Sequence, residues 1–157
     1  IINEVKEICK PGDVIVVDAG GNIEQTLWGD NSATACKVRG AVGVVIDGAC
    51  RDVEAIRKMQ LPTYCRALCP GMKKDVLWPM EYNVPVTCGG IQVKPRDIVF
   101  GDDDGIVVIP HDVAKDALRK TQIFAELDSK VKELLLQGKS VAEAYKARAG
   151  WKKLIGL

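Results

Sequence analysis

Two short runs of apolar residues constrain the fold of this chain more than any other feature. Residues 14–19 (VIVVDA) and residues 41–47 (AVGVVID) are apolar at almost every position and rich in valine and isoleucine. Such runs are typical of strands that are buried on both faces, as in parallel sheets. Between them, residues 33–38 have a helical pattern, with capping residues at 29–32 and a stop at Gly40. The order strand–helix–strand therefore predicts a parallel βαβ half.

The rest of the chain has a different pattern. Glycine-containing turns between short apolar segments predict two hairpins, one turning at Gly89-Gly90 and the other at residues 103–105. From Asp112 onward, apolar residues recur every three or four positions, which is typical of a helix. Shorter patterns predict helices at residues 1–9, 52–59 and 141–149, a strand at residues 63–68 and a helix end at Gly138.

Composition argues against several classes of function. The net charge is +1 and the basic residues form no block, which argues against a nucleic-acid groove. No apolar run approaches the ~20 residues of a membrane-spanning helix. The six cysteines show no C-x2-C spacing, and the single histidine, His111, is distant from them in the sequence. We therefore predict reduced structural cysteines and a cytoplasmic protein that binds neither nucleic acid nor membrane.

Two polar loops follow the two predicted strands. Residues 28–33 (WGDNSA) lead into a helix, whose first N–H groups lack internal partners and suit a carboxylate or phosphate. Residues 47–52 (DGACRD) end in Arg51, whose planar fork of donors suits a carboxylate or enolate, and Asp52, whose oxygens suit Mg²⁺ or Mn²⁺. Because ligands gather at the carboxyl ends of strands in open α/β sheets, we expect both loops at one edge.

Each loop has a simpler interpretation when taken alone. Asp30 or Asn31 would cap the helix, and Arg51 and Asp52 would form a surface ion pair. Together the loops supply an anion site, a cation beside a carbonyl group and a carboxylate for a metal. Retro-aldol cleavage and decarboxylation beside a 2-oxo group both leave an enolate, whose charge a metal and Arg51 would stabilise. The combination predicts a site for a divalent metal and a 2-oxo acid.

The sequence resembles a known family at these residues. Asp30, twenty intervening residues and then Arg51-Asp52 form the D-x20-R-D signature of the class II pyruvate aldolases. The segments GDVIVVDAGG, RGAVGVVIDGACRDV, YNVPVTCGGIQVKPRDIV and GDDDGIVVIP also resemble that family, from about residue 11 to residue 112. The type member cleaves 4-hydroxy-4-methyl-2-oxoglutarate and 4-carboxy-4-hydroxy-2-oxoadipate and decarboxylates oxaloacetate. The resemblance implies a carbon–carbon lyase that releases pyruvate from 4-hydroxy-2-oxo acids.

The resemblance also implies a role for each matching residue. Asp52 would hold the metal, Asp30 would position a metal-bound water, and Arg51 would contact the oxo and carboxylate oxygens of the substrate. In the family, a glutamate from the C-terminal region of a neighbouring subunit completes the metal shell. Glu126 is the first candidate and Glu133 the second, with an exposed helix face as the alternative. The expected set is catalytic Arg51 and Asp30, substrate-binding Gly29, Asp30, Asn31, Ser32, Ala33 and Arg51, and metal-binding Asp52 and Glu126 with Mg²⁺ or Mn²⁺.

For the fold, the resemblance implies a swivelling β/β/α three-layer domain of the α/β class, with a mixed parallel and antiparallel sheet. We expect the core at residues 1–112, without the N-terminal segment that family members carry, and a C-terminal helical extension at residues 113–157. The extension is expected to make the contacts of a homotrimer or homohexamer. An apolar seam that would suit such packing contains Phe124, Leu127, Val131 and Leu134.

One alternative function comes from the same superfamily. It includes the regulator of ribonuclease activity A, a non-enzymatic protein that binds and inhibits ribonuclease E and generally lacks the full acidic signature. The presence of Asp30, Arg51 and Asp52 favours the enzymatic branch. The sequence leaves open which 4-hydroxy-2-oxo acid is the substrate, because the distal half of that molecule is read by pocket walls that no motif identifies.

Overall fold

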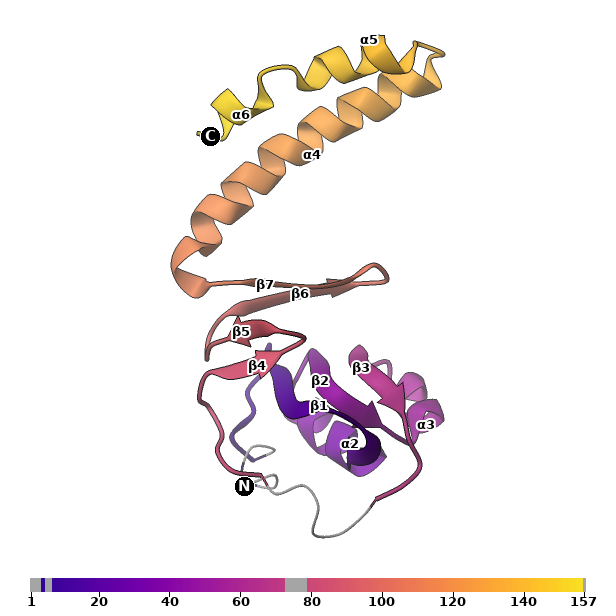
Figure 1. Cartoon of the computed structure of the whole chain (residues 1–157), viewed down its shortest axis with the longest axis vertical. Coiled ribbons are helices and arrows are strands. Elements are labelled where there is room, and N and C mark those ends of the chain that lie inside the picture. Colours follow the sequence, from indigo (N-terminus) through magenta and orange to yellow (C-terminus); the bar gives the residue numbers. More distant parts are fainter. Residues whose placement is uncertain (1–3, 5–6, 73–78, 157) are drawn as a thin grey trace. The chain divides into compact units, whose positions relative to one another are not determined.

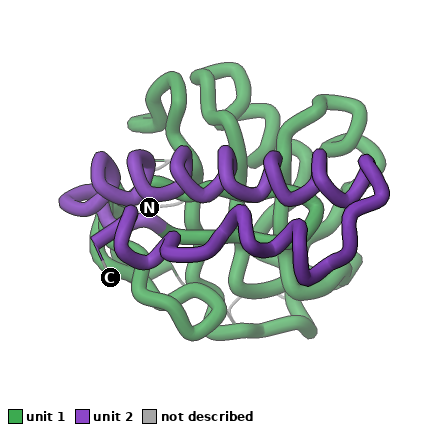
Figure 2. Tube along the Cα trace, turned by 90° about the horizontal axis from the view of Figure 1, so that it is seen from above, with its two compact units in different colours: residues 1–108 green, residues 109–157 purple. Residues whose placement is uncertain are grey.

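The computed structural model describes residues 4, 7–72 and 79–156. The chain divides into two compact units, residues 1–108 and residues 109–157, shown in green and purple in Figure 2. Of the helix predicted at residues 1–9, Glu4, Glu7 and Ile8 are helical and Cys9 is not. Residues 1–3 and 5–6 lie outside the described residues. Across the described ranges, no helix has both the length and the apolar character that a membrane crossing requires.

A three-stranded parallel sheet forms the centre of the first unit (Figure 1). Its strands lie in the order β1 (Val14–Trp28), β2 (Gly43–Cys50) and β3 (Thr63–Leu68). All eight residues of the central strand β2 are buried, which explains its nearly continuous apolar sequence. The helix α2 (Asp30–Val38) connects β1 to β2, so the predicted parallel βαβ half is confirmed.

Strand β1 is longer than its apolar run predicts. It continues past Gly20 and Gly21 to Trp28. Its regular pairing with β2 is interrupted after Asp18 and resumes, with shifts in register, at Asn22, Thr26 and Trp28. The ten residue steps from Asp18 to Trp28 run beside three steps of β2, from Asp47 to Cys50. Gly20 and Gly21 have φ values of 61° and 73°, a region that glycine adopts without strain. The predicted strand end at the glycine pair is therefore wrong, since the pair turns the strand without ending it.

Helices α2 and α3 (Val53–Lys58) pack against the sheet. Cys36 of α2 and Ile56 of α3 belong to one buried cluster with Val44, Ile46 and Cys50 of β2. The apolar contacts of this cluster form the core of the first unit, and their burial is the main stabilising contribution to it. Strand β2 ends at Cys50, three residues later than predicted, so the loop that leads into α3 is shorter than the sequence suggests.

Two hairpins form the third layer. β4 (Val86–Cys88) pairs antiparallel with β5 (Ile91–Val93), and β6 (Ile98–Asp102) pairs with β7 (Gly105–Ile109). Along β3, Cys65 packs against the helix-side core, whereas the hydroxyl of its neighbour Tyr64 donates to the carbonyl of Asp102 at 3.1 Å. Because neighbouring side chains of a strand point to opposite faces, the hairpins lie on the face away from the helices. The predicted three-layer α/β class with parallel and antiparallel pairing is confirmed.

The second unit is a helical hairpin. A short 3₁₀ turn, η1 (His111–Val113), leads into α4 (Ala114–Leu136), and the chain returns through α5 (Val141–Tyr145), η2 (Lys146–Arg148) and α6 (Trp151–Leu154). The ring of Phe124 packs edge-on against Trp151, with 4.9 Å between centroids, and the Arg148 guanidinium lies 4.5 Å above the same ring. The predicted seam of α4 is thus contacted from within the chain at Phe124. Its packing against a neighbouring subunit stays a prediction.

Candidate active site

The two predicted site loops meet at the carboxyl edge of the parallel sheet. Arg51 is the first residue after β2, and its N–H donates to the carbonyl of Trp28, the last residue of β1, at 3.0 Å. The next residue, Asp52, has a left-handed φ of 57° and is the N-cap of α3. The structure therefore brings the start of α2 and the start of α3 together. Asp30, Arg51 and Asp52 are called the edge cluster from here on.

Gly29 is the point of closest approach between the two loops. A Cβ atom at Gly29 would lie 2.5 Å from Asp52 Oδ2 and 3.1 Å from Arg51 Nε, so a side chain there would displace the carboxylate. The N–H of Asp30 donates to the same Asp52 oxygen at 3.4 Å. This carboxylate lies at the N-terminus of α2, where the helix dipole favours negative charge. Glycine at this position is a packing requirement of the edge cluster.

The start of α2 differs from the predicted cradle for a carboxylate. Asp30 is the first residue of α2, and its Oδ1 accepts the N–H of Asn31 at 2.6 Å. The N-cap of α2 is Gly29 and no side chain caps the helix, so the simple interpretation in which Asp30 or Asn31 is the cap is wrong. The N–H of Ala33 donates to the carbonyl of Gly29 at 3.0 Å. Of the backbone N–H groups expected to receive a carboxylate, those of Asn31 and Ala33 are therefore engaged within the chain, and Ser32 is a buried residue. A substrate carboxylate would reach the Asn31 N–H by replacing the Asp30 side chain.

Arg51 lies beside the Asp52 carboxylate with an incomplete set of hydrogen bonds. Its Nε is 3.3 Å from Asp52 Oδ2, in an ion pair whose side chains are 34% and 38% exposed. Although the charges are close, this buried Nε has no hydrogen-bond partner of good geometry among the described residues. An exposed ion pair of this kind stabilises a fold by at most about 1 kcal/mol. The guanidinium thus lies at the edge of the sheet with part of its hydrogen-bonding capacity unfilled, which suits an anionic ligand.

The donor set of the edge cluster fits a hard divalent cation. Mg²⁺ and Mn²⁺ prefer oxygen ligands, and Mg²⁺ commonly takes one or two carboxylates while keeping several waters. Asp30 and Asp52 supply two carboxylates, from two loops that meet at Gly29. Among the residues that the structure describes, no three His, Cys, Asp or Glu side chains gather as a metal site. Glu126 and Glu133 are exposed on α4 in the second unit, and their predicted role as ligands for a neighbouring subunit stays a prediction.

A second group of charged side chains joins the sheet to the β4–β5 hairpin. It consists of Asp18, Asp47 and Arg66, called the hairpin cluster below. Asp18 and Asp47 are cross-strand neighbours on β1 and β2, and each sends one carboxylate oxygen to the hairpin backbone. Asp18 Oδ2 accepts the N–H of Thr87 at 3.1 Å, and Asp47 Oδ2 accepts the N–H of Gly89 at 3.0 Å. These bonds fasten the edge of β4 to the sheet.

Arg66 completes the hairpin cluster. Its Nε donates to Asp47 Oδ1, and this bond lowers the pKa of Asp47 against the opposing effect of burial. The sequence alone predicts no role for Arg66 or Asp47, because Arg66 is a single charged residue in a short strand and Asp47 ends an apolar run. The signal that identifies the pair is strand alternation, which places Tyr64 and Arg66 on the hairpin face of β3.

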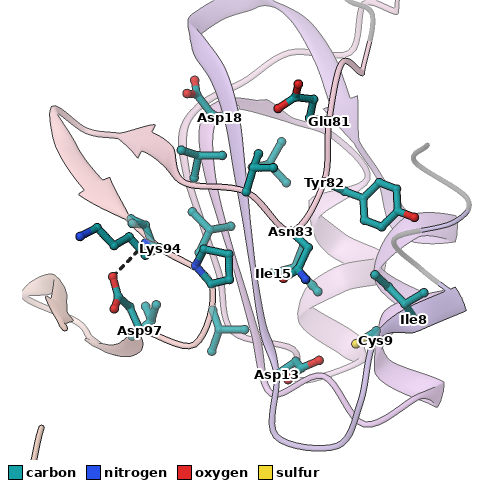
Figure 3. Close-up of a pocket in the computed structure, with 18 of the residues that line it drawn as sticks. Ile8, Cys9, Asp13, Ile15, Asp18, Glu81, Tyr82, Asn83, Lys94 and Asp97 are labelled. Atoms are coloured by element: carbon teal, nitrogen blue, oxygen red, sulfur yellow. Dashed lines mark hydrogen bonds between the residues drawn. The ribbon is translucent and has the colours of Figure 1, made fainter. Parts of the chain in front are cut away.

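The larger described cavity does not contain the edge cluster. It has a volume of about 940 Å³ and follows β1, with Asp18 and Glu81 at one end, Asp13 at the other, and Lys94 and Asp97 to one side (Figure 3). No predicted catalytic or metal-binding residue lines it. Trp28 does line it, although this residue is 4% exposed and packs in the core. The walls of the cavity are mainly apolar, with charged residues such as Asp18, Glu81 and Lys94 among them. We place the candidate site at the edge cluster because Arg51 and Asp52 meet there at the start of α2.

Known proteins are similar in sequence to this chain. Residues 1–108 match the family described as RraA-like, Aldolase/RraA. A relative from Halalkalibacterium halodurans, provisionally named 4-hydroxy-4-methyl-2-oxoglutarate aldolase, is 38% identical over 112 residues, which cover 71% of this chain and 53% of the relative. The chain thus spans about half the length of that relative.

Solved structures share the fold. Streptomyces coelicolor RraAS2, described as an unusual member of the RNase ES inhibitor RraA protein family, superposes with a TM-score of 0.73 at 34% identity, over 82% of this chain and 67% of that one. An uncharacterised protein from Pseudomonas syringae pv. tomato superposes with a TM-score of 0.84 over 92% of this chain and 68% of that one. At 24% identity, the latter is a likeness of fold alone.

Proposed function

The chain belongs to the aldolase/RraA family, as the D-x20-R-D resemblance predicts, and on that basis we propose that it is a metal-dependent carbon–carbon lyase. Its reaction would cleave a 4-hydroxy-2-oxo acid to release pyruvate, with decarboxylation of oxaloacetate as a related activity. The observation that carries this proposal is the convergence at Gly29, where Asp52 Oδ2 lies within 3.4 Å of the Asp30 N–H and 3.3 Å of Arg51 Nε. The two loops thus bring the Asp52 carboxylate and the Arg51 guanidinium to the residue that carries the second carboxylate, Asp30, and such a reaction uses groups of these kinds.

Arg51 has the central role in the proposed mechanism. Its guanidinium would bind the 2-oxo and carboxylate oxygens of the pyruvyl group, and it would stabilise the oxygen that becomes negative as the C–C bond breaks. The start of α2, from Gly29 to Ala33, would receive the substrate carboxylate. For this to happen the Asp30 side chain must leave the Asn31 N–H, which it occupies at 2.6 Å. Asp30 would therefore give up its hydrogen bond to the Asn31 N–H when it helps to hold the cation.

Asp52 and Asp30 would hold the divalent cation, Mg²⁺ or Mn²⁺, directly or through water. When bound, such a cation polarises the 2-oxo group and stabilises developing negative charge. Glu126 of a neighbouring subunit is proposed to complete the shell, in a homotrimer or homohexamer whose contacts involve the helical unit. Glu133, about two turns further along α4, is the second candidate.

The test of the proposal is pyruvate release from oxaloacetate, measured with Mg²⁺ or Mn²⁺ and with a blank that contains metal but no protein. The native chain is expected to exceed the blank, and Arg51→Ala is expected to fall to it. Arg119→Ala is the matched control, because Arg119 is an exposed arginine paired with Asp116 on α4. Equal rates for the native chain, Arg51→Ala and the blank would contradict the proposal.

A second candidate function is supported by the likeness to Streptomyces coelicolor RraAS2, at 34% identity and a TM-score of 0.73. In that case the chain would bind a ribonuclease of the RNase E type without catalysing a reaction of its own. The variant Asp52→Asn distinguishes the two functions. A lyase would lose its activity in this variant, whereas ribonuclease binding through a surface elsewhere on the fold would be unchanged. Ribonuclease inhibition that survives in Asp52→Asn, together with no lyase activity in the native chain, would favour the regulator.

A further inference from the structure

The outer edge of β1 has no strand partner in the part of the chain that the structure describes. β1 is the first strand in the order β1–β2–β3, so only one of its two edges is paired. Apart from the ladder with β2, the backbone of residues 14–19 forms no hydrogen bond to another described element or loop. Such an edge presents a row of N–H and C=O groups that can pair with a further strand.

The cavity of about 940 Å³ follows this unpaired edge (Figure 3). Every residue from Asp13 to Ala19 lines it. Because neighbouring side chains of a strand point to opposite faces, a cavity lined by all of them reaches both faces of β1. A cavity that runs along the edge of a strand has this access, so the backbone groups of the edge belong to its wall.

The side chains of β1 are less buried than their sequence predicts. Val14, Ile15, Val16 and Val17 are each partly exposed, whereas all eight residues of β2 are buried. Both strands have the nearly continuous apolar sequence of a strand that is covered on both faces. The difference indicates that β1 is suited to a cover that the described residues do not supply.

A buried donor beside the cavity indicates what kind of cover fits. Trp28 lines the cavity and is 4% exposed, and its indole N–H has no acceptor among the described residues. A carbonyl group of the occupant would supply that acceptor. A purely apolar molecule offers neither this carbonyl nor partners for the backbone of the edge, whereas an extended peptide offers both.

The charges along the cavity restrict the sequence of such a peptide. Asp18 and Glu81 lie together at one end (Figure 3). The cations of the lining come from the turns of Asp13 and Asp97, and they are Lys10, Lys94 and Arg96. A basic side chain of the occupant would therefore be complementary to the end that holds Asp18 and Glu81.

We propose that the cavity along β1 binds an extended segment of a partner protein, which adds a strand to the free edge of β1. The segment would be mainly apolar and would carry a basic residue beside Asp18 and Glu81. In this mode of recognition, main-chain hydrogen bonds give affinity and alternate side chains give specificity. No member of the edge cluster lines the cavity, so the peptide site is separate from the proposed lyase site.

The experiment measures the binding of synthetic hexapeptides to the chain by isothermal titration calorimetry. The probe alternates valine and threonine and carries lysine at its N-terminus or, in a second version, at its C-terminus, because an added strand can run in either direction. At least one version is expected to bind the native chain, and to bind Glu81→Lys at least tenfold more weakly. A probe with glutamate in place of lysine should reverse that order. Glu54→Lys is the matched control and should leave binding within twofold, because Glu54 is exposed on α3 outside the cavity.

Alternate N-methylation of the probe separates strand pairing from apolar contact alone. Successive N–H groups of a strand point to opposite edges, so methyl groups on every second residue block one edge and leave the other free. Of the two alternately methylated probes, one is expected to lose at least tenfold in affinity and the other to stay within threefold of the parent.

The proposal would be overturned if both methylated probes bound as tightly as the parent, since apolar contact would then explain the binding. It would also be overturned if no hexapeptide bound, or if Glu81→Lys and the native chain bound the lysine probe equally. A dimer in analytical ultracentrifugation that excludes the probes would assign the edge to a second copy instead. None of these readouts uses lyase activity, so failure of this proposal is distinguishable from failure of the proposed function.

Discussion

The edge cluster and the hairpin cluster each contain two aspartates and one arginine, but they use their hydrogen bonds differently. In the hairpin cluster all four carboxylate oxygens accept a bond, from Arg66 and from three backbone N–H groups. In the edge cluster, Asp52 Oδ2 has contacts of 3.3 and 3.4 Å, and the buried Arg51 Nε lacks a good partner. Fully satisfied polar groups fix a structure, whereas the side chains of Arg51 and Asp52, which are 34% and 38% exposed, keep hydrogen-bonding capacity for a ligand. Residue type alone therefore does not separate a structural group from a functional one.

The largest expected effect tests the functional side of this comparison. Arg51→Ala should lower the rate of pyruvate release from oxaloacetate by about 10²–10³-fold, because it removes the cation that stabilises the developing charge. Its free energy of unfolding should change by less than about 1 kcal/mol, since the ion pair with Asp52 is partly exposed. Enzyme kinetics and urea denaturation on the same preparation check both parts. A variant that lost stability rather than rate would make the edge cluster structural.

The next effect tests the structural side. Asp47→Ala should lower the free energy of unfolding by about 2–3 kcal/mol, because the Gly89 N–H and Arg66 would lose their acceptor. Arg66 is about half exposed, so water recovers part of the cost. Urea denaturation measures the change, and Asp104→Ala, at the exposed β6–β7 turn, is the control. An unaltered denaturation midpoint would show that the hairpin is held by other contacts.

Gly29→Ala tests whether activity depends on the position of the Asp52 carboxylate in the edge cluster. The new methyl group would lie 2.5 Å from Asp52 Oδ2, and the carboxylate would have to move. We expect pyruvate release to fall about 10–100-fold, since misplacement of a catalytic group by about 1 Å has costs of that order. Gly90→Ala is a useful contrast, because a Cβ atom there meets nothing within 4 Å, although its φ of 80° adds backbone strain. Full activity in Gly29→Ala would remove Asp52 from the mechanism.

The smallest effect concerns pH. The bond from Arg66 lowers the pKa of Asp47 from its usual 3.8, so the folded state holds this carboxylate in its charged form more strongly than the unfolded state does. That contribution is fully present above the unfolded pKa and is lost as pH falls through the lower folded pKa. The groups that face Asp47 are Arg66, Asp18 and Cys88. Acid titration of stability should therefore be shallower below about pH 4 in Asp47→Asn than in the native chain.

Much of the fold follows from local sequence, because the residue pattern of each element reflects how that element is buried. The apolar run of β2 reflects burial on both faces, and the hairpins at Gly89-Gly90 and residues 103–105 follow from turn chemistry. The course of β1 beyond Gly20 does not follow, since ten of its residue steps are matched to three on another strand. Helix α6 was not predicted, because its four residues carry no periodic pattern.

The candidate site shows the same division. Loop order placed Asp30 and Arg51 at one edge, because the carboxyl ends of parallel strands share an edge whatever the details of packing. The engagement of the Asn31 N–H by Asp30 depends on a rotamer, which the sequence does not encode. The hairpin cluster was missed since its partners, Asp47 and Gly89, are 42 residues apart and meet only after the third layer has folded onto the sheet.

The central claim is that the edge cluster, and not the hairpin cluster, performs the chemistry at the pyruvyl group. Its most direct test is nuclear magnetic resonance of deuterium exchange at the pyruvate methyl group in D₂O with Mg²⁺, since exchange requires the same enolate and no distal half of the substrate. The native chain and Arg66→Ala are expected to catalyse exchange at rates within about threefold of each other, and Arg51→Ala and Asp52→Asn to fall to the metal blank. Exchange that persists in Arg51→Ala and Asp52→Asn, or that disappears in a folded Arg66→Ala, would contradict the account.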